Sequence, residues 1–409
     1  MRNFLWTGCF SYFLIGLAHV IIGAMLPELL AHYGKDYSAG GQLVSLQFFG
    51  FLVGVLAGPW LSAKLGKKGA LLLCLFCLTA AESVFFTLPS WSLVLMTAPL
   101  AGFGFGMVET IIGGVVIGYI ADTKQKTAAM ARLEVFFGIG ALVMPLIVSL
   151  MITTGWWRGS FAILALISAV ILALWALLPM GEMSGVLTKQ SPLPETGQAS
   201  ANHARTGSRP RKGRPVLWMT LFIAVFALYV GAEMSLANFL PSILLENAGI
   251  KPELGALSVT CFWGAIAVGR LFAAQLAGRW GHARYLIVSC AGGAAALALF
   301  ASITSVAAGF VIIVALGLLM SGMFAVALVF ANSFFPGKEE RVTSVLIASG
   351  GAGGALIPLL TGWCMDRLSL GLTLWVLVSL YVLLLALVIA ASRFRAPSVR
   401  RSSAEAARS

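Results

Sequence analysis

Three ionisable residues lie inside long apolar stretches of the sequence. Glu109, Glu233 and Arg270 each fall near the middle of a hydrophobic run. A charged side chain at the centre of a membrane helix costs about 2.5–3.5 kcal/mol on insertion scales, so such residues are candidates for function. Desolvation favours a neutral carboxyl group and a nearby guanidinium favours a charged one, so this combination suits proton uptake and release. We therefore expect Glu109 and Glu233 to bind protons. A purely structural pair that joins two parts of the protein is the alternative.

Weaker polar candidates lie in the same runs. His19 is suited to relaying a proton or binding substrate, and a histidine that only packs against other helices is an equal alternative. Glu134 lies near the start of the apolar run 128–153 and is suited to a contact in a cytoplasmic gate. Amide side chains supply hydrogen bonds, and aromatic rings stack on a sugar or an apolar substrate, although simple packing is the alternative for them. The predicted substrate-binding or gate residues are His19, Gln47, Phe48, Glu233, Asn238, Trp263, Arg270 and Asn332.

The composition places these residues in a membrane protein. Of the 409 residues, 59% are hydrophobic and 10% are charged, and the mean hydropathy is +0.95. Soluble domains carry about 25% charged residues, so a soluble enzyme and a disordered chain are both excluded. Runs of about 20 apolar residues match the thickness of a bilayer core. Twelve such runs are expected at 3–30, 41–61, 69–88, 91–120, 128–153, 158–179, 216–245, 255–278, 284–303, 307–334, 342–365 and 370–392.

The expected architecture is an all-α integral membrane protein with 12 transmembrane helices. Residues 180–215 are rich in Ser, Pro, Gly and Arg and predict a flexible, basic cytoplasmic linker. The linker separates one six-helix bundle, 1–179, from a second, 216–392, and residues 393–409 form a cytoplasmic tail. A monomer is expected, because each half supplies the partner of the other.

Charge distribution predicts the orientation. With the N-terminus in the cytoplasm, 22 Lys and Arg residues fall in cytoplasmic segments and four fall outside, while Arg270 lies within a run. This asymmetry is the positive-inside pattern of a multi-pass protein of the cytoplasmic membrane, with both termini inside. The net charge of +12 is therefore explained by the orientation and predicts no nucleic-acid partner, while the apolar runs predict contact with the lipid bilayer.

Several other kinds of function lack the residues they require. Cys74 and Cys77 have CxxC spacing, but no cluster of His or Cys accompanies them, so no metal is expected. There is no phosphate-binding loop and no nucleophile with an adjacent base, so we predict no enzyme and no cofactor. A proton gradient is the expected energy source.

The two halves repeat one another at an offset of about 215 residues. Gly16 corresponds to Gly231, and the segment GIGALVMP, which ends at Pro145, corresponds to GAGGALIP, which ends at Pro358. Glycine allows close helix contact and proline requires a kink or a protected position, so their shared spacing indicates duplication. Parallel six-helix halves with a long linker are the pattern of the major facilitator fold, whose substrate site lies between the halves.

Local motifs resemble one branch of that superfamily, the fucose–galactose–glucose:proton symporters. The resemblance rests on Tyr229–Glu233, on Trp263-Gly264 followed by Gly269-Arg270, on the segment GGAGGALIPLL, and on Val108-Glu109-Thr110. It implies proton coupling through the carboxylate of Glu109 and transport of a sugar-like solute.

The sequence also departs from that branch. Ile111 and Ile112 follow where the branch has Asn-Pro after Glu-Thr, Gly23 replaces a membrane aspartate, and Ala63 replaces the usual aspartate of a loop motif. These changes predict a more apolar cavity, whereas a sugar requires many hydrogen-bonding groups. Two functions stay open: a proton-coupled symporter for a sugar-like solute, and a proton-driven antiporter that exports drugs or metabolites.

Overall fold

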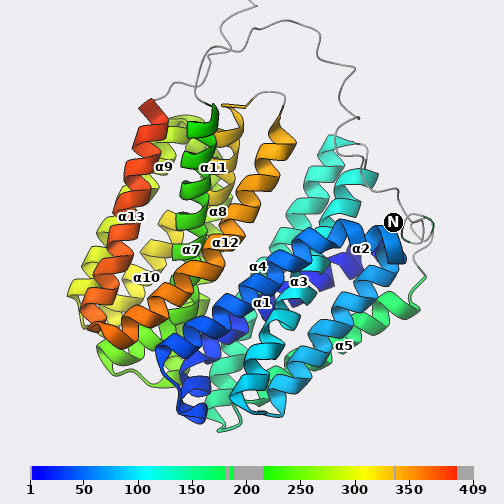
Figure 1. Cartoon of the computed structure of the whole chain (residues 1–409), viewed down its shortest axis with the longest axis horizontal. Coiled ribbons are helices and arrows are strands. Elements are labelled where there is room, and N and C mark those ends of the chain that lie inside the picture. The colour runs from blue at the N-terminus through cyan, green and yellow to red at the C-terminus, as the bar shows by residue number, and fades with distance from the viewer. Residues whose placement is uncertain are drawn as a thin grey trace, which may run out of the picture.

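Two groups of helices meet at one end of the molecule and diverge at the other (Figure 1), as a computed structural model shows. The structure describes residues 2–120, 122–179, 185, 187, 215–335 and 338–393. The N-terminal group contains α1 (Arg2–Tyr33), α2 (Tyr37–Phe86), α3 (Trp91–Tyr119), α4 (Thr123–Thr153) and α5 (Gly159–Leu177). The C-terminal group contains α7 (Pro215–Ala248), α8 (Pro252–Trp280), α9 (His282–Ser302), α10 (Val306–Met320), α11 (Met323–Asn332), α12 (Glu339–Arg367) and α13 (Leu370–Arg393).

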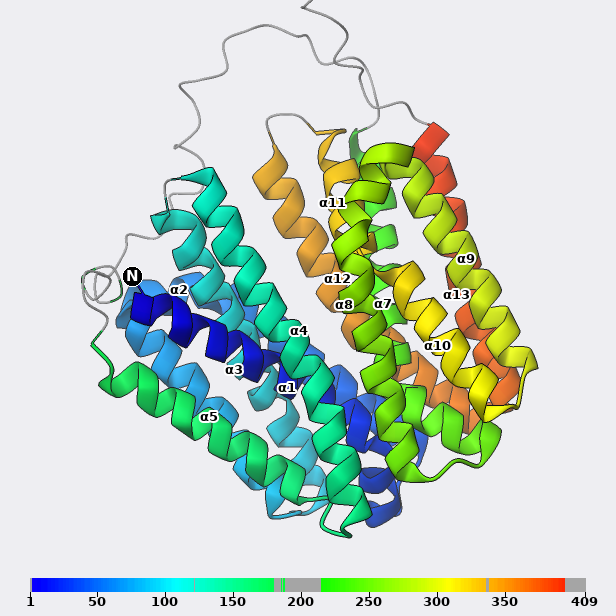
Figure 2. The same cartoon turned by 180° about the vertical axis from the view of Figure 1, so that it is seen from behind.

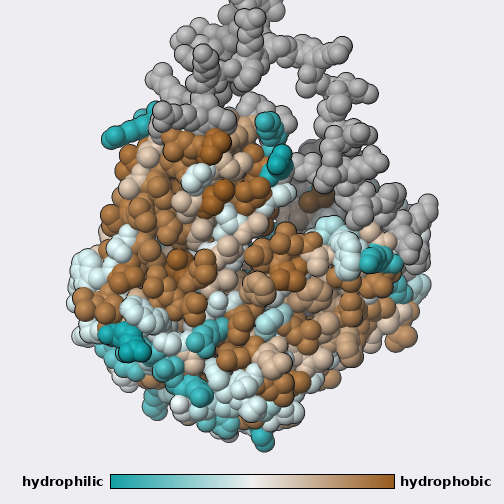
Figure 3. Space-filling model, viewed as in Figure 1, coloured by the Kyte–Doolittle hydropathy of each residue, from teal (hydrophilic) through white to brown (hydrophobic). Residues whose placement is uncertain are grey.

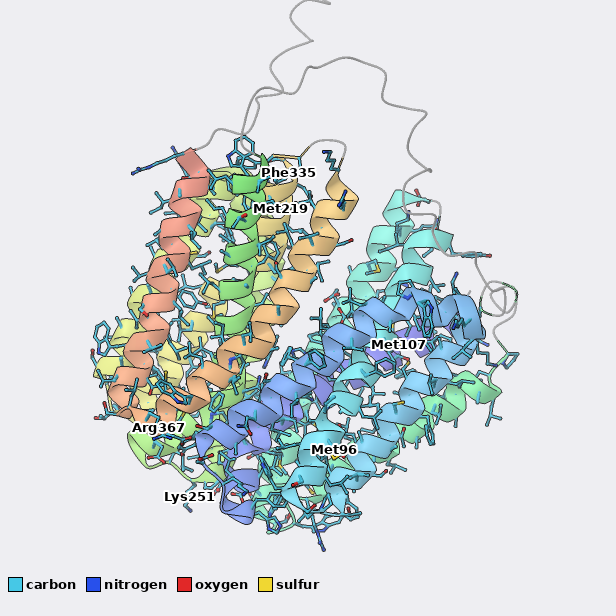
Figure 4. All side chains as sticks on the ribbon, viewed as in Figure 1. Met96, Met107, Met219, Lys251, Phe335 and Arg367 are labelled. Atoms are coloured by element: carbon cyan, nitrogen blue, oxygen red, sulfur yellow. The ribbon has the colours of Figure 1, made fainter. Side chains whose placement is uncertain are left out.

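The two ends of the molecule differ in the contacts between the groups. We call the end where α5 finishes and α7 begins the linker end, and the opposite end, where α1 and α12 finish, the far end. Lys251 and Arg367 lie at the far end, and Met219 and Phe335 lie at the linker end (Figure 4). The groups touch toward the far end and separate toward the linker end. Most of the predicted linker 180–215 and of the predicted tail 393–409 lies outside the described residues.

The surface of the described part is that of a membrane protein. Eleven of its helices are long and apolar enough to cross a bilayer. Hydrophobic side chains cover the flanks of both groups, and hydrophilic ones gather around the far end (Figure 3). A bilayer solvates such flanks and a helix satisfies its own backbone there, which explains why a sequence with few charges is folded in this form.

Three predicted runs are organised differently from expectation. The runs 41–61 and 69–88 join in the 50-residue α2, in which Gly66 has φ 73° and ψ 158° and breaks the helical backbone. Among the described residues eleven helices thus have spanning length, with the two predicted runs lying in α2 on either side of Gly66, and the twelve predicted spans stay a prediction. The run 307–334 is divided into α10 and α11 by Ser321 and Gly322, with φ 71° at Gly322. A glycine reaches positive φ without the strain of a Cβ, so it allows each interruption.

Two tyrosines compensate the break between α10 and α11. The Tyr229 hydroxyl donates to the carbonyl oxygen of Met320 at 3.1 Å, and the Tyr285 hydroxyl donates to the carbonyl oxygen of Ser321. An unpaired carbonyl in a membrane interior costs several kcal/mol, so these hydroxyl groups make the interruption tolerable.

The internal repeat appears as the same helix crossing in each half. A Cβ added to Gly16 on α1 would overlap the carbonyl oxygen of Phe137 on α4, and one added to Gly140 on α4 would overlap that of Phe13. In the second half Gly231 on α7 packs against α12, and Gly353 on α12 packs against the carbonyl of Ala227. Reciprocal glycines at corresponding positions thus let α1 approach α4 and α7 approach α12.

Hydrogen bonds also join the groups at the far end. The Asp366 carboxylate on α12 accepts from the backbone N–H of Tyr37 at 2.9 Å, and from the backbone N–H and hydroxyl of Ser38. The Tyr37 hydroxyl donates to Glu246 on α7 at 2.7 Å. We call these contacts the far-end latch. They satisfy first-turn N–H groups of α2 with a carboxylate from the other half, where the helix dipole also favours negative charge.

Candidate functional site

His19 lies at the centre of an aromatic cluster between the halves. Its ring centroid is 5.4–5.8 Å from the ring centroids of four other side chains, at near edge-to-face angles. These rings come from four helices: Phe48 on α2, Phe105 on α3, Phe137 on α4 and Trp263 on α8. His19 itself is half-buried and accepts or donates no hydrogen bond within the described residues. Its ring nitrogens are therefore free to bind a ligand.

Buried polar atoms without partners surround this cluster. Gln47 bonds the carbonyl of Ala18 through Nε2 at 3.4 Å, which leaves its Oε1 unpaired. The indole N–H of Trp263, which is 5% exposed, has no acceptor. Asn238 bonds Met234 through Nδ2 and leaves its Oδ1 unpaired. An unsatisfied buried polar group costs about 1–3 kcal/mol, so such groups together indicate a place where a polar ligand binds.

A cavity of about 540 Å³ begins on the linker-end side of this cluster. Its polar lining comes from Glu134 on α4, Tyr229 on α7, Arg270 on α8 and His282 on α9. The broken helix supplies Gly322, Phe324, Ala325, Val326 and Val329, and α8 supplies Ala273, Ala274 and Ala277. The walls are thus mainly apolar, as the departures from the sugar-transporter motifs predict, with a few charged groups placed among them.

Arg270 is the positive charge of this cavity. Its side chain is exposed to the cavity and makes no hydrogen bond or ion pair among the described residues. Glu233 and Glu134 lie within its electrostatic range, as does His19. Glu233 is 6% exposed and its Oε1 has no hydrogen-bond partner. The arginine therefore lies between a carboxylate of its own half and one of the other half.

Glu109 lies on α3 of the N-terminal group and is not among the residues that line the cavity. It is half-buried, and its backbone carbonyl accepts a hydrogen bond from the Tyr12 hydroxyl at 3.2 Å. Glu134 lies within its electrostatic range. The two predicted proton-binding carboxylates are thus in different halves, with Glu134 and Arg270 between them.

One predicted site residue lies elsewhere. Asn332 ends α11 at the linker end and bonds the Thr343 hydroxyl of α12 at 2.9 Å. It does not line the cavity. Asn332 is two residues from the end of the predicted run 307–334, so its place near the linker end agrees with that run and keeps it apart from the cluster around His19.

The structure also adds residues that the sequence did not single out. Phe105 and Phe137 complete the rings around His19, and Tyr229 and His282 line the cavity. The chain has 26 phenylalanines, and no local pattern separates these two from the others. Tyr229 is four residues from Glu233, so the helical repeat was a usable signal for it.

The sequence matches the profile of the Major Facilitator Superfamily over residues 8–306 and again over 221–409. The chain belongs to the Major Facilitator Superfamily. It is therefore a membrane transporter and not an enzyme, and the resemblance of its motifs to this superfamily is confirmed. Two overlapping matches agree with a sequence that contains a repeated half.

Individual relatives are similar over nearly the whole chain. The glucose/mannose transporter GlcP of Bacillus subtilis (strain 168) is 29% identical over 95% of this chain and 94% of its own length. The inner membrane transport protein YdiN of Escherichia coli (strain K12) is 23% identical over 93% of this chain and 87% of its own length. Among solved structures, a D-xylose-proton symporter has a TM-score of 0.75 at 12% identity, over 95% of this chain and 97% of that one. At that identity the structural likeness shows the fold alone.

Proposed function

We propose that the protein is a proton-coupled symporter for a monosaccharide of the glucose or mannose type. The observation that carries the proposal is the cluster around His19, where ring faces and unpaired polar atoms from both halves meet. A sugar has apolar ring faces and hydroxyl groups, so it fits aromatic platforms flanked by amide and indole groups. The similarity to GlcP supports the same substrate class.

The arrangement of the halves supports transport by alternating access. The far end is closed by the latch, and the cavity lies on the linker-end side of the cluster. Rocking of one half against the other exposes a site between them to each side in turn. We place the linker end and both termini in the cytoplasm, with twelve spans if the two parts of α2 cross separately. The transporter works as a monomer in the cytoplasmic membrane.

Each carboxylate has its own role in this proposal. Glu109 takes up the proton in the N-terminal half, and Glu233 responds to it in the C-terminal half through Arg270. The substrate binds at His19, Gln47, Phe48, Asn238 and Trp263. No cofactor is required, since the proton gradient drives uptake.

Purified protein in liposomes with an internal pH dye tests the proposal. Without an imposed gradient, addition of D-glucose or D-mannose outside is expected to acidify the interior, because each sugar enters with a proton. Liposomes without protein and a pentitol that lacks the pyranose ring are the controls. Sugar entry without acidification would rule out proton coupling. The absence of any sugar entry would rule out the proposed substrate class.

The apolar cavity walls favour a second candidate, a proton-driven exporter of amphipathic drugs or metabolites. Phe324, Val326 and Val329 offer surface to such a molecule and no hydrogen bonds. In the same liposomes an antiporter moves protons opposite to the added compound. If protons move opposite to added amphipathic cations and do not move when sugars are added, the exporter function is favoured over the sugar symporter.

A further inference from the structure

Helices α4 and α8 meet along a seam that is closed toward the far end and open toward the linker end (Figure 2). The Thr260 hydroxyl donates to the Leu142 carbonyl at 3.2 Å, and a Cβ on Gly264 would lie 3.5 Å from the Leu142 side chain. Further along, a Cβ on Gly138 would lie 4.0 Å from Ala267. The helices run in opposite directions, so moving to lower numbers on α4 means moving to higher numbers on α8.

The next turn of this seam carries two opposite charges. Four residues beyond Gly138 on α4 is Glu134, and three beyond Ala267 on α8 is Arg270. Both line the cavity, from opposite halves, and they are within electrostatic range of each other. No ion pair joins them in the described structure, since the helices have already diverged at this level.

Beyond the charges, the seam is built from small residues. Ala131 on α4 and Ala274 on α8 occupy the following turn, with Ala277 and Gly278 after them on α8. A Cβ on Gly278 would meet nothing within 4 Å, so space is left open there. Small residues at helical spacing let two membrane helices approach closely. The linker-end part of the seam is thus shaped for a contact that this conformation does not make.

We infer that Glu134 and Arg270 form an ion pair that closes the linker end when α4 and α8 come together along the whole seam. Glu134 is a positioning residue of the transport cycle. In the closed state the Arg270 side chain then interacts with the Glu134 carboxylate of the other half in place of Glu233 in its own half. The inference rests on the proposed alternating access, but it does not depend on the substrate or on the proton.

Other charged neighbours do not replace this pair. Arg132 is two residues from Glu134, so it points to a different face of α4, where it lies within electrostatic range of Cys9 on α1. Glu233 lies on α7, in the same half as Arg270, so a pair between these two residues does not connect the halves.

Charge exchange tests the pair in a transport assay. Glu134→Arg and Arg270→Glu each place like charges in the closed seam, and each is expected to reduce uptake by about 10- to 100-fold, the usual size of a coupling between conformational states. The double variant restores opposite charges and is expected to recover about tenfold over either single variant. Arg279→Glu, at the end of the same helix and outside the cavity, is the matched control. Because Arg270 also acts on Glu233, a double variant no better than the single ones overturns the pair when Glu134→Gln also fails to slow the cross-linking described next.

Disulfide trapping tests closure without any substrate. In a variant without the six native cysteines, Ala131→Cys with Ala274→Cys is expected to cross-link in membranes under mild oxidation, because closure brings the two Cα atoms within disulfide range of about 4.4–6.8 Å. The control pair is Ala131→Cys with Phe272→Cys, because Phe272 lies on the opposite face of α8. Adding Glu134→Gln is expected to slow cross-linking about tenfold.

The two assays separate the possible failures. Cross-linking of the seam pair that is faster than the control and slowed by Glu134→Gln supports the inference even if no sugar is transported. Cross-linking equal to that of the control, in a protein that transports sugar, overturns it and leaves the proposed function intact.

Discussion

Unpaired polar atoms in a membrane interior are candidates for ligand contact where they gather beside other binding groups. Gln47, Asn238 and Trp263 each keep one buried polar atom without a partner, although each residue belongs to a well-packed helix. A helix that only needed to pack would carry an apolar residue at these positions. Unpaired atoms also occur elsewhere, as at Glu82, so the proposed substrate site is set apart by the combination of these atoms with the aromatic rings around His19. That combination also provides a way to distinguish a sugar from an amphipathic drug.

Trp263→Phe keeps an aromatic ring and removes the indole N–H. If a sugar hydroxyl accepts from this group, KM rises by about 2- to 10-fold, since one hydrogen bond contributes about 0.5–1.5 kcal/mol net. Uptake of radiolabelled sugar measures the change, and Trp280→Phe, 17 residues further on at the end of α8, serves as control. An unchanged KM would show that the indole N–H does not contact the substrate.

Glu109→Gln removes the proposed proton-binding group in the N-terminal half. The variant is expected to lose accumulation of sugar against a gradient, because an amide cannot carry a proton through the cycle, while exchange of labelled for unlabelled sugar continues. Glu253→Gln, at the first turn of α8 at the far end, is the control. Accumulation at the wild-type level in Glu109→Gln would assign coupling to another group.

The sequence located the charged residues because their cost in a membrane does not depend on which way a helix is turned. Glu109, Glu233 and Arg270 were recognisable from hydropathy alone. Phe105 and Phe137 were not, since their part in the site depends on the rotation of α3 and α4 around His19. Rotation is set by tertiary contacts that a single sequence does not display.

At the scale of the element, the repeated glycines explain why each half packs as it does. Gly16 with Gly140, and Gly231 with Gly353, bring backbone against backbone at corresponding crossings. The sequence predicted the repeat from this spacing. It did not predict the break after Met320, because Gly322 is one of 45 glycines and the hydroxyl groups that satisfy the freed carbonyls belong to Tyr229 and Tyr285 on other helices.

Gly353→Ala is expected to destabilise the C-terminal half. The added methyl group overlaps the Ala227 carbonyl, so α7 and α12 must separate, at a cost of about 1–3 kcal/mol or more. Gly114→Ala is the matched control, since its Cβ would meet nothing within 4 Å and an alanine raises helix stability by about 0.5–1 kcal/mol. Thermal unfolding in detergent measures both. Equal melting temperatures would show that the α7–α12 crossing has room for a methyl group.

At the scale of the whole molecule, the proposed alternating access makes two contacts at opposite ends responsible for which end is open. The far-end latch is formed in this conformation, and the Glu134–Arg270 contact of the seam is not. In a rocking transporter one end closes as the other opens. Strengthening the contact at one end and weakening the contact at the other therefore shifts the population between the two forms.

Asp366→Ala tests this balance at the far end. The substitution removes the carboxylate that accepts from Tyr37 and Ser38, and loss of such an N-terminal acceptor costs about 0.5–2 kcal/mol. If that energy holds the halves together, the ratio of far-end-closed to far-end-open molecules falls by about 2- to 30-fold. Asp122→Ala is the matched control, because Asp122 accepts from the Gln125 N–H of its own helix and joins no halves.

Spin labels at Lys35 and Lys251, one in each half at the far end, measure the outcome. Asp366→Ala is expected to add a population at longer distance, and Asp122→Ala is expected to leave the distribution unchanged. Because the seam closes as the far end opens, the same Asp366→Ala substitution should speed disulfide formation between cysteines at 131 and 274. A longer far-end distance without faster cross-linking would mean that the two ends open independently, which a rigid rocking of two halves does not allow.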